Sequence, residues 1–148
     1  MRTPGQSKSA AIDMAYQIFW EDFVYCAPDA IVENLPVRLK HGVCHGKELT
    51  FWHLGSNSAD FLKNGVAWER CQYIPWIKFM LVHYQECFCW QNWRKGEQSL
   101  CLVDPEWKFV VVLRYRPKYF LLWTAYPLSA QRRRKLQKEY QEATENAN

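Results

Sequence analysis

Two hydroxyl-bearing residues stand near the C-terminal end of the chain, in the segment Thr124-Ala125-Tyr126-Pro127. If residues 119–126 form a strand, strict alternation places Thr124 and Tyr126 on one face together with Phe120 and Leu122. Hydroxyl groups hydrogen-bond phosphate oxygens, and a phenol can also donate or relay a proton. Threonine and tyrosine also have high strand propensity, so the spacing alone favours an ordinary strand end.

A histidine and an arginine upstream could complete a phosphate site. His53 follows Phe51-Trp52, and its side chain titrates near neutral pH, as a general acid or base must. Arg70 could hold two phosphate oxygens at once. Both residue types have commoner structural roles: a histidine beside apolar residues is usually satisfied within the core, and a single arginine usually pairs with a carboxylate such as Glu69.

A second group of residues could bind a nucleotide without doing chemistry. Trp93 and Lys95 lie at an expected hairpin tip, where an aromatic ring beside a cation suits a base and its phosphate. The simpler interpretation is a solvated turn. The basic run 132–135 could touch a phosphate backbone, although a solvated helix face is the commoner role of such a run.

The charge distribution agrees with an anionic partner. Residues 1–74 carry seven Lys/Arg and eight Asp/Glu, and residues 75–148 carry twelve and seven, so the halves have net charges of −1 and +5. A basic C-terminal half is typical of proteins that contact RNA, although this excess is moderate.

Metal and nucleotide-hydrolysis motifs are weak in this sequence. His41, Cys44, His45, Cys87 and Cys89 are soft ligands, but their spacing matches no common zinc motif. A structural zinc is therefore the lesser alternative, and buried thiols are the better interpretation. No glycine-rich phosphate loop is present, so we expect no cofactor and no metal.

Length and composition indicate one soluble domain. A chain of 148 residues with 49% apolar and 23% charged residues can build one hydrophobic core. Residues 1–8 are polar and are expected to be disordered, and residues 9–148 are expected to form a single domain. No signal peptide and no apolar run long enough to cross a membrane is seen, which favours a cytoplasmic protein.

The pattern of apolar residues predicts an α+β fold. Ser9 could cap a helix from about Ala10 to Tyr25, and Ser129 could cap another from Ala130 to about residue 143. Residues 36–41 and 48–54 look extended, and residues 76–83 could be helix or strand. Four strand-like runs joined by short turns predict an antiparallel meander; they cover residues 86–93, 99–103, 108–115 and 119–126.

From about Phe51 to the C-terminus, the chain resembles the bacterial and phage-associated nuclease superfamily named after barnase, EndoU, colicin-type ribonucleases and RelE. The likeness is greatest to its phage and mobile-element branch. The segments that carry it are Phe51-Trp52-His53, Glu69-Arg70-Cys71 with Ile74-Pro75-Trp76, Trp93-x-x-Gly96-Glu97, Val110-Val111-Val112-Leu113, and Tyr119-Phe120-Leu121-Leu122-Trp123-Thr124-Ala125-Tyr126-Pro127. The last of these is the most specific.

The resemblance implies a nuclease-like domain in which an N-terminal helix packs on a four-stranded antiparallel meander followed by a C-terminal helix. It further implies a toxin-like or phage-conflict endonuclease that cuts RNA without a metal, by attack of a 2′-hydroxyl on the adjacent phosphodiester. The implied catalytic residues are His53, Arg70, Thr124 and Tyr126, and an antitoxin or immunity protein is a possible partner. The alternative is a non-catalytic RNA- or protein-binding module on the same sheet.

Overall fold

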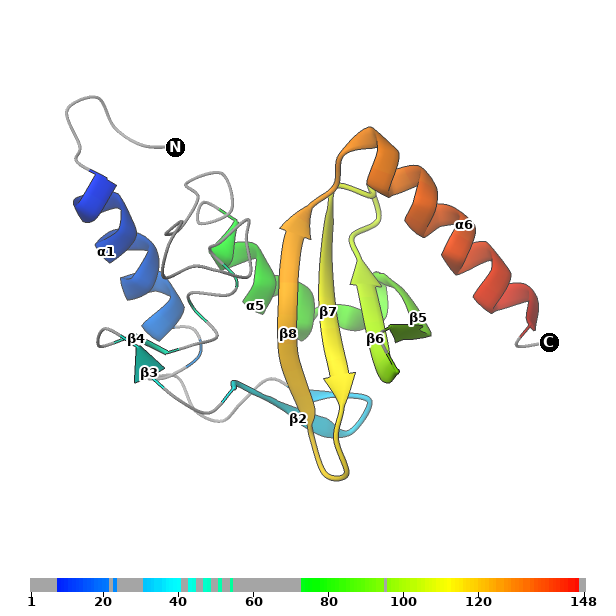
Figure 1. The fold of residues 1–148 in the computed structure, drawn as a ribbon, viewed down its shortest axis with the longest axis horizontal. Coiled ribbons are helices and arrows are strands. Elements are labelled where there is room, and N and C mark those ends of the chain that lie inside the picture. Colours follow the sequence, from blue (N-terminus) through cyan, green and yellow to red (C-terminus); the bar gives the residue numbers. More distant parts are fainter. Residues whose placement is uncertain are drawn as a thin grey trace.

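The computed structural model describes residues 8–21, 23, 31–40, 43–44, 47–48, 51, 54, 73–94 and 96–146. Within this part of the chain the fold is α+β, as predicted (Figure 1). Its helices are α1 (Lys8–Trp20), α5 (Ile74–Val82), the short 3₁₀ helix η2 (Tyr84–Glu86) and α6 (Ala130–Asn146).

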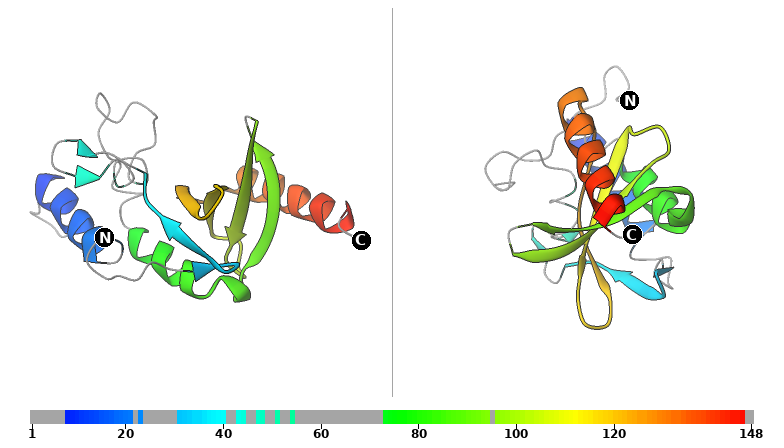
Figure 2. Two further views of the ribbon diagram at one scale, coloured as in Figure 1. Left: turned by 90° about the horizontal axis from the view of Figure 1, so that it is seen from below. Right: turned by 90° about the vertical axis from the view of Figure 1, so that its right-hand side faces the viewer.

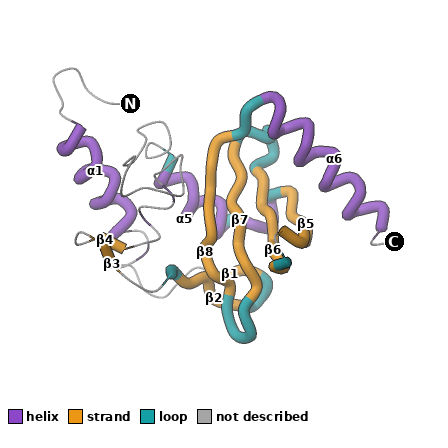
Figure 3. Tube along the Cα trace, viewed as in Figure 1, coloured by secondary structure: helices purple, strands orange, loops and turns teal. Residues whose placement is uncertain are grey.

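The predicted meander is present, and it belongs to a larger sheet. Its antiparallel strands, each joined to the next by a short turn, are β5 (Phe88–Arg94), β6 (Glu97–Val103), β7 (Phe109–Tyr115) and β8 (Phe120–Pro127). Two further strands, β1 (Ile31–Val32) and β2 (Leu35–Arg38), extend the sheet beside β8 (Figure 3). The sheet is therefore larger than the predicted one of four antiparallel strands.

The sheet is mixed because β2 pairs with β8 in parallel. Its strand order is β1-β2-β8-β7-β6-β5, and it curls strongly (Figure 2). A parallel pair needs a long connection, so β2 and β8 lie far apart in the chain and no local pattern announces their pairing. A separate small hairpin joins β3 (Val43–Cys44) to β4 (Lys47–Glu48).

Both faces of the sheet are buried along β7. Val111 and Leu113 face the core that α1 and α5 share, whereas Val110 and Val112 face the core beneath α6. A strand that is covered on both sides has a continuous apolar run instead of an alternating one, which explains the sequence of β7.

We expected the N-terminal helix to pack on the sheet, but it does not lie directly on it. Helix α5 covers that face through Tyr73 and Trp76, whose rings contact Phe109 at the start of β7, and α1 packs on α5. Residues 76–83, which could have been helix or strand, are largely helical. The predicted cap at Ser9 is wrong, because α1 begins at Lys8.

The expectation of an extended segment over residues 48–54 is also wrong at two positions. Phe51 and Leu54 have helical backbone and are fully buried. Their spacing of three places both side chains on one side of a helical turn. Phe51 contacts the rings of Tyr16 and Phe19 of α1, with centroids 5.1 and 5.5 Å apart, so a residue with helical backbone joins the core where alternation suggested a strand.

Helix α6 begins as predicted and is tied to the edge strand. The Ser129 Oγ accepts a hydrogen bond from the backbone N–H of Arg132 at 3.2 Å, which caps the helix. Further along, the Glu139 carboxylate accepts hydrogen bonds from Trp90 Nε1 at 2.9 Å and Asn92 Nδ2 at 2.7 Å. These bonds hold α6 across β5, so that it leaves the end of β8 and runs toward the other edge of the sheet (Figure 1).

No helix among the described residues is both long and apolar enough to cross a membrane.

Candidate functional site

A β-bulge in β8 decides which residues face α6. Val112 pairs with Thr124, but Leu113 pairs with Leu122, so Trp123 is an extra residue in β8. Leu122 and Ala125 consequently both point into the core shared with α5, although three positions separate them. The prediction that Leu122 and Phe120 share a face with Thr124 is wrong for this reason.

Thr124 and Tyr126 do share a face, as predicted. Their partners in β7 are Val112 and Val110, both of which belong to the core beneath α6. Residues paired across an antiparallel ladder lie on the same face. The two hydroxyl-bearing residues therefore stand on the α6 side of the sheet, and both are half-buried.

Two cations lie over the ring of the bulged residue. The guanidinium carbon of Arg114 is 3.4 Å from the centroid of the Trp123 ring, and the Lys40 Nζ is 3.7 Å from it. Because β8 lies between β2 and β7 in the sheet, these cations come from the two sides of the strand: Arg114 from β7 and Lys40 from the segment after β2. An aromatic face attracts a cation and keeps its charge available to a ligand.

Arg114 sits in a polar cluster that is deeply set in the sheet. Its side chain is only 12% exposed, and its nearest carboxylate oxygen, on Glu97, is 3.8 Å away. Glu97 is closer to Arg116, whose Nη1 donates to it at 2.9 Å. The Nε of Arg114 and the Oγ of its cross-strand partner Ser99 are buried and have no hydrogen-bond partner among the described residues. Burial of such groups without a partner is costly, so the fold holds Arg114 in this cluster against a free-energy penalty.

A third cation lies over the second aromatic ring of β8. The guanidinium carbon of Arg132, from the first turn of α6, is 4.6 Å from the centroid of the Tyr126 ring. Its neighbour Arg133 is used structurally, because its Nε donates to the backbone oxygen of Trp107 at 3.1 Å. The basic run 132–135 is therefore only partly a solvated helix face.

These residues form one surface, which we call the cationic stripe. It comprises Trp123, Thr124 and Tyr126 of β8 with the three cations Lys40, Arg114 and Arg132. Thr124 stands between the two aromatic residues that carry these cations. Cations and a hydroxyl gathered in this way suit an anion such as a phosphate, because the charges attract it and the hydroxyl can hydrogen-bond its oxygens.

Two cations of the stripe, Lys40 and Arg114, are partly desolvated, and their pKa values are lowered. Burial, the larger cause, and the neighbouring charge of Arg114 together lower the pKa of Lys40 to about 8. Burial also lowers the pKa of Arg114; Glu97 opposes that shift and Arg116 adds to it. Arg114 remains charged at neutral pH, as arginines do in proteins, whereas Lys40 titrates just above neutrality.

The structure does not join the other predicted residues to the stripe. Trp93 is 70% exposed, and its pairing with Gln98 places it on the opposite face from Trp90 and Asn92, which contact α6. His53, Arg70 and Lys95 lie outside the described residues, so their positions stay predictions.

The described cysteines in or beside the sheet, Cys87, Cys89 and Cys101, are free thiols. Cys87 and Cys89 are half-buried, and burial, the largest cause, raises the pKa of Cys89 to about 12, which keeps that thiol protonated. Over the ranges that the structure describes, no three His, Cys, Asp or Glu side chains are grouped closely enough to hold an ion.

Comparison with known proteins assigns this chain to no family. No protein-family model, no curated protein and no solved structure significantly matches the chain. The functional argument therefore depends on the stripe and on the residues that the sequence resemblance singled out.

Proposed function

We propose that this chain is a metal-independent RNA endonuclease that binds the RNA backbone along the cationic stripe. The observation that carries the proposal is the set of three cations over two aromatic rings of one strand, with Thr124 between those rings. Phosphates would be held by Arg114, Lys40 and the Thr124 hydroxyl. A toxin-like or phage-conflict role follows from the sequence resemblance alone.

In the proposed reaction a base removes the proton of a 2′-hydroxyl, whose oxygen then bonds to the adjacent phosphorus. The bond from phosphorus to the 5′-oxygen breaks, and that oxygen takes a proton from an acid. The products are a 2′,3′-cyclic phosphate and a 5′-hydroxyl. Negative charge builds on the phosphate oxygens in between, and a preformed guanidinium such as Arg114 stabilises it most at that point.

The proton-transfer roles follow the sequence prediction. His53 would act as general base or acid, Tyr126 would relay a proton, and Arg70 would add a second guanidinium. Tyr126 is the described member of this set, and it lies on the α6 face of the sheet with Thr124. We therefore assign it, with Thr124, to the reacting phosphate.

Substitution of the proposed site residues tests this assignment. Purified full-length protein should cleave RNA in EDTA, and Tyr126→Phe and His53→Ala should each slow cleavage by about 100-fold, as loss of a proton-transfer group does. Thr124→Val, which keeps the shape and removes the hydroxyl, should slow it by about tenfold. If Tyr126→Phe and His53→Ala both cleave at the full rate, the site has been assigned wrongly.

The alternative is a non-catalytic RNA-binding module that uses the same stripe. One observation favours it: the three cations of the stripe can hold phosphates by charge alone, with no proton transfer. This alternative predicts salt-sensitive RNA binding with intact RNA in every condition.

The affinity for RNA should change with pH as Lys40 loses its charge. Its pKa of about 8 means that the ammonium is charged at pH 7 and largely neutral at pH 9, so phosphate attraction is lost as pH rises through 8. Removal of one charge contact of this kind weakens binding by roughly fivefold, about 1 kcal/mol. Lys40→Arg keeps its charge and should flatten the profile, as followed by fluorescence anisotropy of a labelled RNA. An unchanged profile in Lys40→Arg would assign the titration to another group.

A further inference from the structure

A second candidate surface lies on α5, away from the stripe. Along one side of this helix, Trp76, Phe79, Met80 and His83 recur at spacings of three and four, which places them in one row. Phe79 is 64% exposed, and Trp76 and Val82 are also exposed. Large apolar side chains that gather on one exposed helix face indicate an interaction site.

This row forms one wall of a groove of about 590 Å³. The turn between β6 and β7, residues 104–106, forms another wall, and Glu86 and Cys87 also line the groove. The groove floor is mostly apolar. Its length follows α5, whose nine residues span roughly 13 Å at 1.5 Å per residue. That length accommodates about two turns of another helix.

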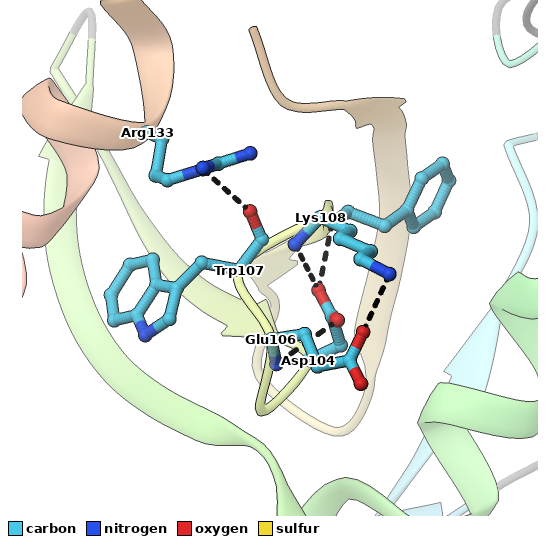
Figure 4. Close-up of polar contacts among 6 residues, drawn as sticks. Asp104, Glu106, Trp107, Lys108 and Arg133 are labelled. Carbon is cyan, nitrogen blue, oxygen red and sulfur yellow. Dashed lines mark hydrogen bonds and ion pairs between the residues drawn. The ribbon is translucent and has the colours of Figure 1, made fainter. Parts of the chain in front are cut away.

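The wall formed by the β6–β7 turn is rigid (Figure 4). The Asp104 carboxylate accepts hydrogen bonds from the backbone N–H groups of Lys108 at 2.7 Å, Phe109 at 2.8 Å and Glu106 at 3.2 Å. Trp107 has positive φ, 58°, and its backbone oxygen accepts the bond from Arg133 of α6. A groove whose walls are already ordered loses little conformational entropy when it is filled.

The rim of the groove is acidic. Glu86, Asp104 and Glu106 all line it, and the side chains of Glu86 and Glu106 are 74% and 69% exposed. Lys108 pairs with Glu106 at 2.7 Å, and His83 Nδ1 lies 3.4 Å from a Glu86 carboxylate oxygen, so three carboxylates face one lysine and one histidine. The whole chain has a net charge of +4, whereas the rim of this groove is negative. The rim therefore favours a positively charged partner. An RNA would be repelled here.

We propose that this groove binds an amphipathic helix of a partner protein that has an apolar face flanked by Lys or Arg. The apolar face would cover Trp76 and Phe79, and the basic flanks would reach Glu86 and Glu106. A second copy of the chain does not supply such a helix from α6, because the apolar side of α6 already packs on the sheet through Leu136 and Tyr140. This inference does not depend on the proposed nuclease activity.

Two designed peptides of roughly 16 residues test the proposal, both with the same leucine face and one with lysine flanks, the other with glutamate flanks. Anisotropy with the full-length protein should show that the lysine peptide binds about tenfold more tightly. Phe79→Ser should weaken that binding about tenfold, and the double change Glu86→Lys with Glu106→Lys should invert the preference. Ile31→Ser, at an exposed apolar residue outside the groove, should change neither affinity.

Three results would overturn the proposal. They are equal affinity for the two peptides, full affinity in a Phe79→Ser variant whose circular dichroism is unchanged, and an unchanged preference for the lysine peptide in the double variant Glu86→Lys with Glu106→Lys. The last result would place the peptide outside the groove. Because peptide binding is measured without RNA cleavage, loss of the nuclease assignment would leave this test intact.

Discussion

Replacing Arg114 by methionine is expected to lower the affinity for single-stranded RNA by about 30-fold, because a charged hydrogen-bonding group on a phosphate contributes about 2 kcal/mol. The Arg114 side chain is 12% exposed and its guanidinium lies over the Trp123 ring, so the charge is held in place before RNA arrives. Methionine keeps the length and apolar stem of the side chain, which limits damage to the sheet. Filter binding at several salt concentrations measures the effect. The slope of log affinity against log salt concentration should become shallower by about the amount that one phosphate contact contributes.

The control for this prediction is Arg134→Met. Arg134 is an exposed residue of α6, outside the stripe, and its loss changes the net charge by the same amount. We expect it to weaken binding by less than about twofold. The loss of RNA affinity in Arg114→Lys should lie between the losses in the two methionine variants, since lysine keeps the charge and loses the planar stacking. Equal losses in Arg114→Met and Arg134→Met would show that binding follows net charge and that the stripe is not the site.

Leu122→Ala is expected to lower the free energy of unfolding by about 3 kcal/mol, as large cavities in cores do. Leu122 is fully buried in the core shared with α5, on the opposite face from the stripe. Its neighbour Leu121 is half-buried and pairs with Arg114 on the α6 face, so Leu121→Ala should cost less than about 1.5 kcal/mol. Urea denaturation of the two variants compares identical side chains one residue apart.

This pair of variants also tests the bulge at Trp123. The bulge places Leu122 and Ala125 in one core, so Ala125→Lys should destabilise the fold by several kcal/mol, whereas Thr124→Lys should be tolerated better. If Ala125→Lys is the milder of the two, β8 alternates strictly and the stripe is misassigned.

Local patterns in the sequence predicted the meander well. The four strands begin and end within about two residues of their predicted limits, because short turns and apolar runs are properties of neighbouring residues. The cap at Ser129 was readable for the same reason. The parallel pairing of β2 with β8 and the helical backbone at Phe51 and Leu54 depend on contacts distant in the chain, and no local pattern contains them.

The candidate site was only half visible in the sequence. Thr124 and Tyr126 were identified, and Arg132 was noted only within the basic run 132–135. Lys40 and Arg114 were missed, because nothing local shows that they meet over β8. One signal was available: Arg114 follows five consecutive apolar residues of β7. A charge within a strand buried on both faces must be paired or used. The bulge was invisible because Trp123 is a favourable strand residue at any register.

The most direct test of the central claim compares one RNA oligonucleotide with its fully 2′-O-methylated form, in EDTA, with the full-length protein. The account predicts that both bind with similar affinity, that Arg114→Met weakens both, and that only the unmodified RNA is cut to products ending in 2′,3′-cyclic phosphate. Cleavage of the methylated oligonucleotide, or a need for added metal, would contradict the proposed reaction. Failure of both oligonucleotides to bind would contradict the assignment of the cationic stripe itself.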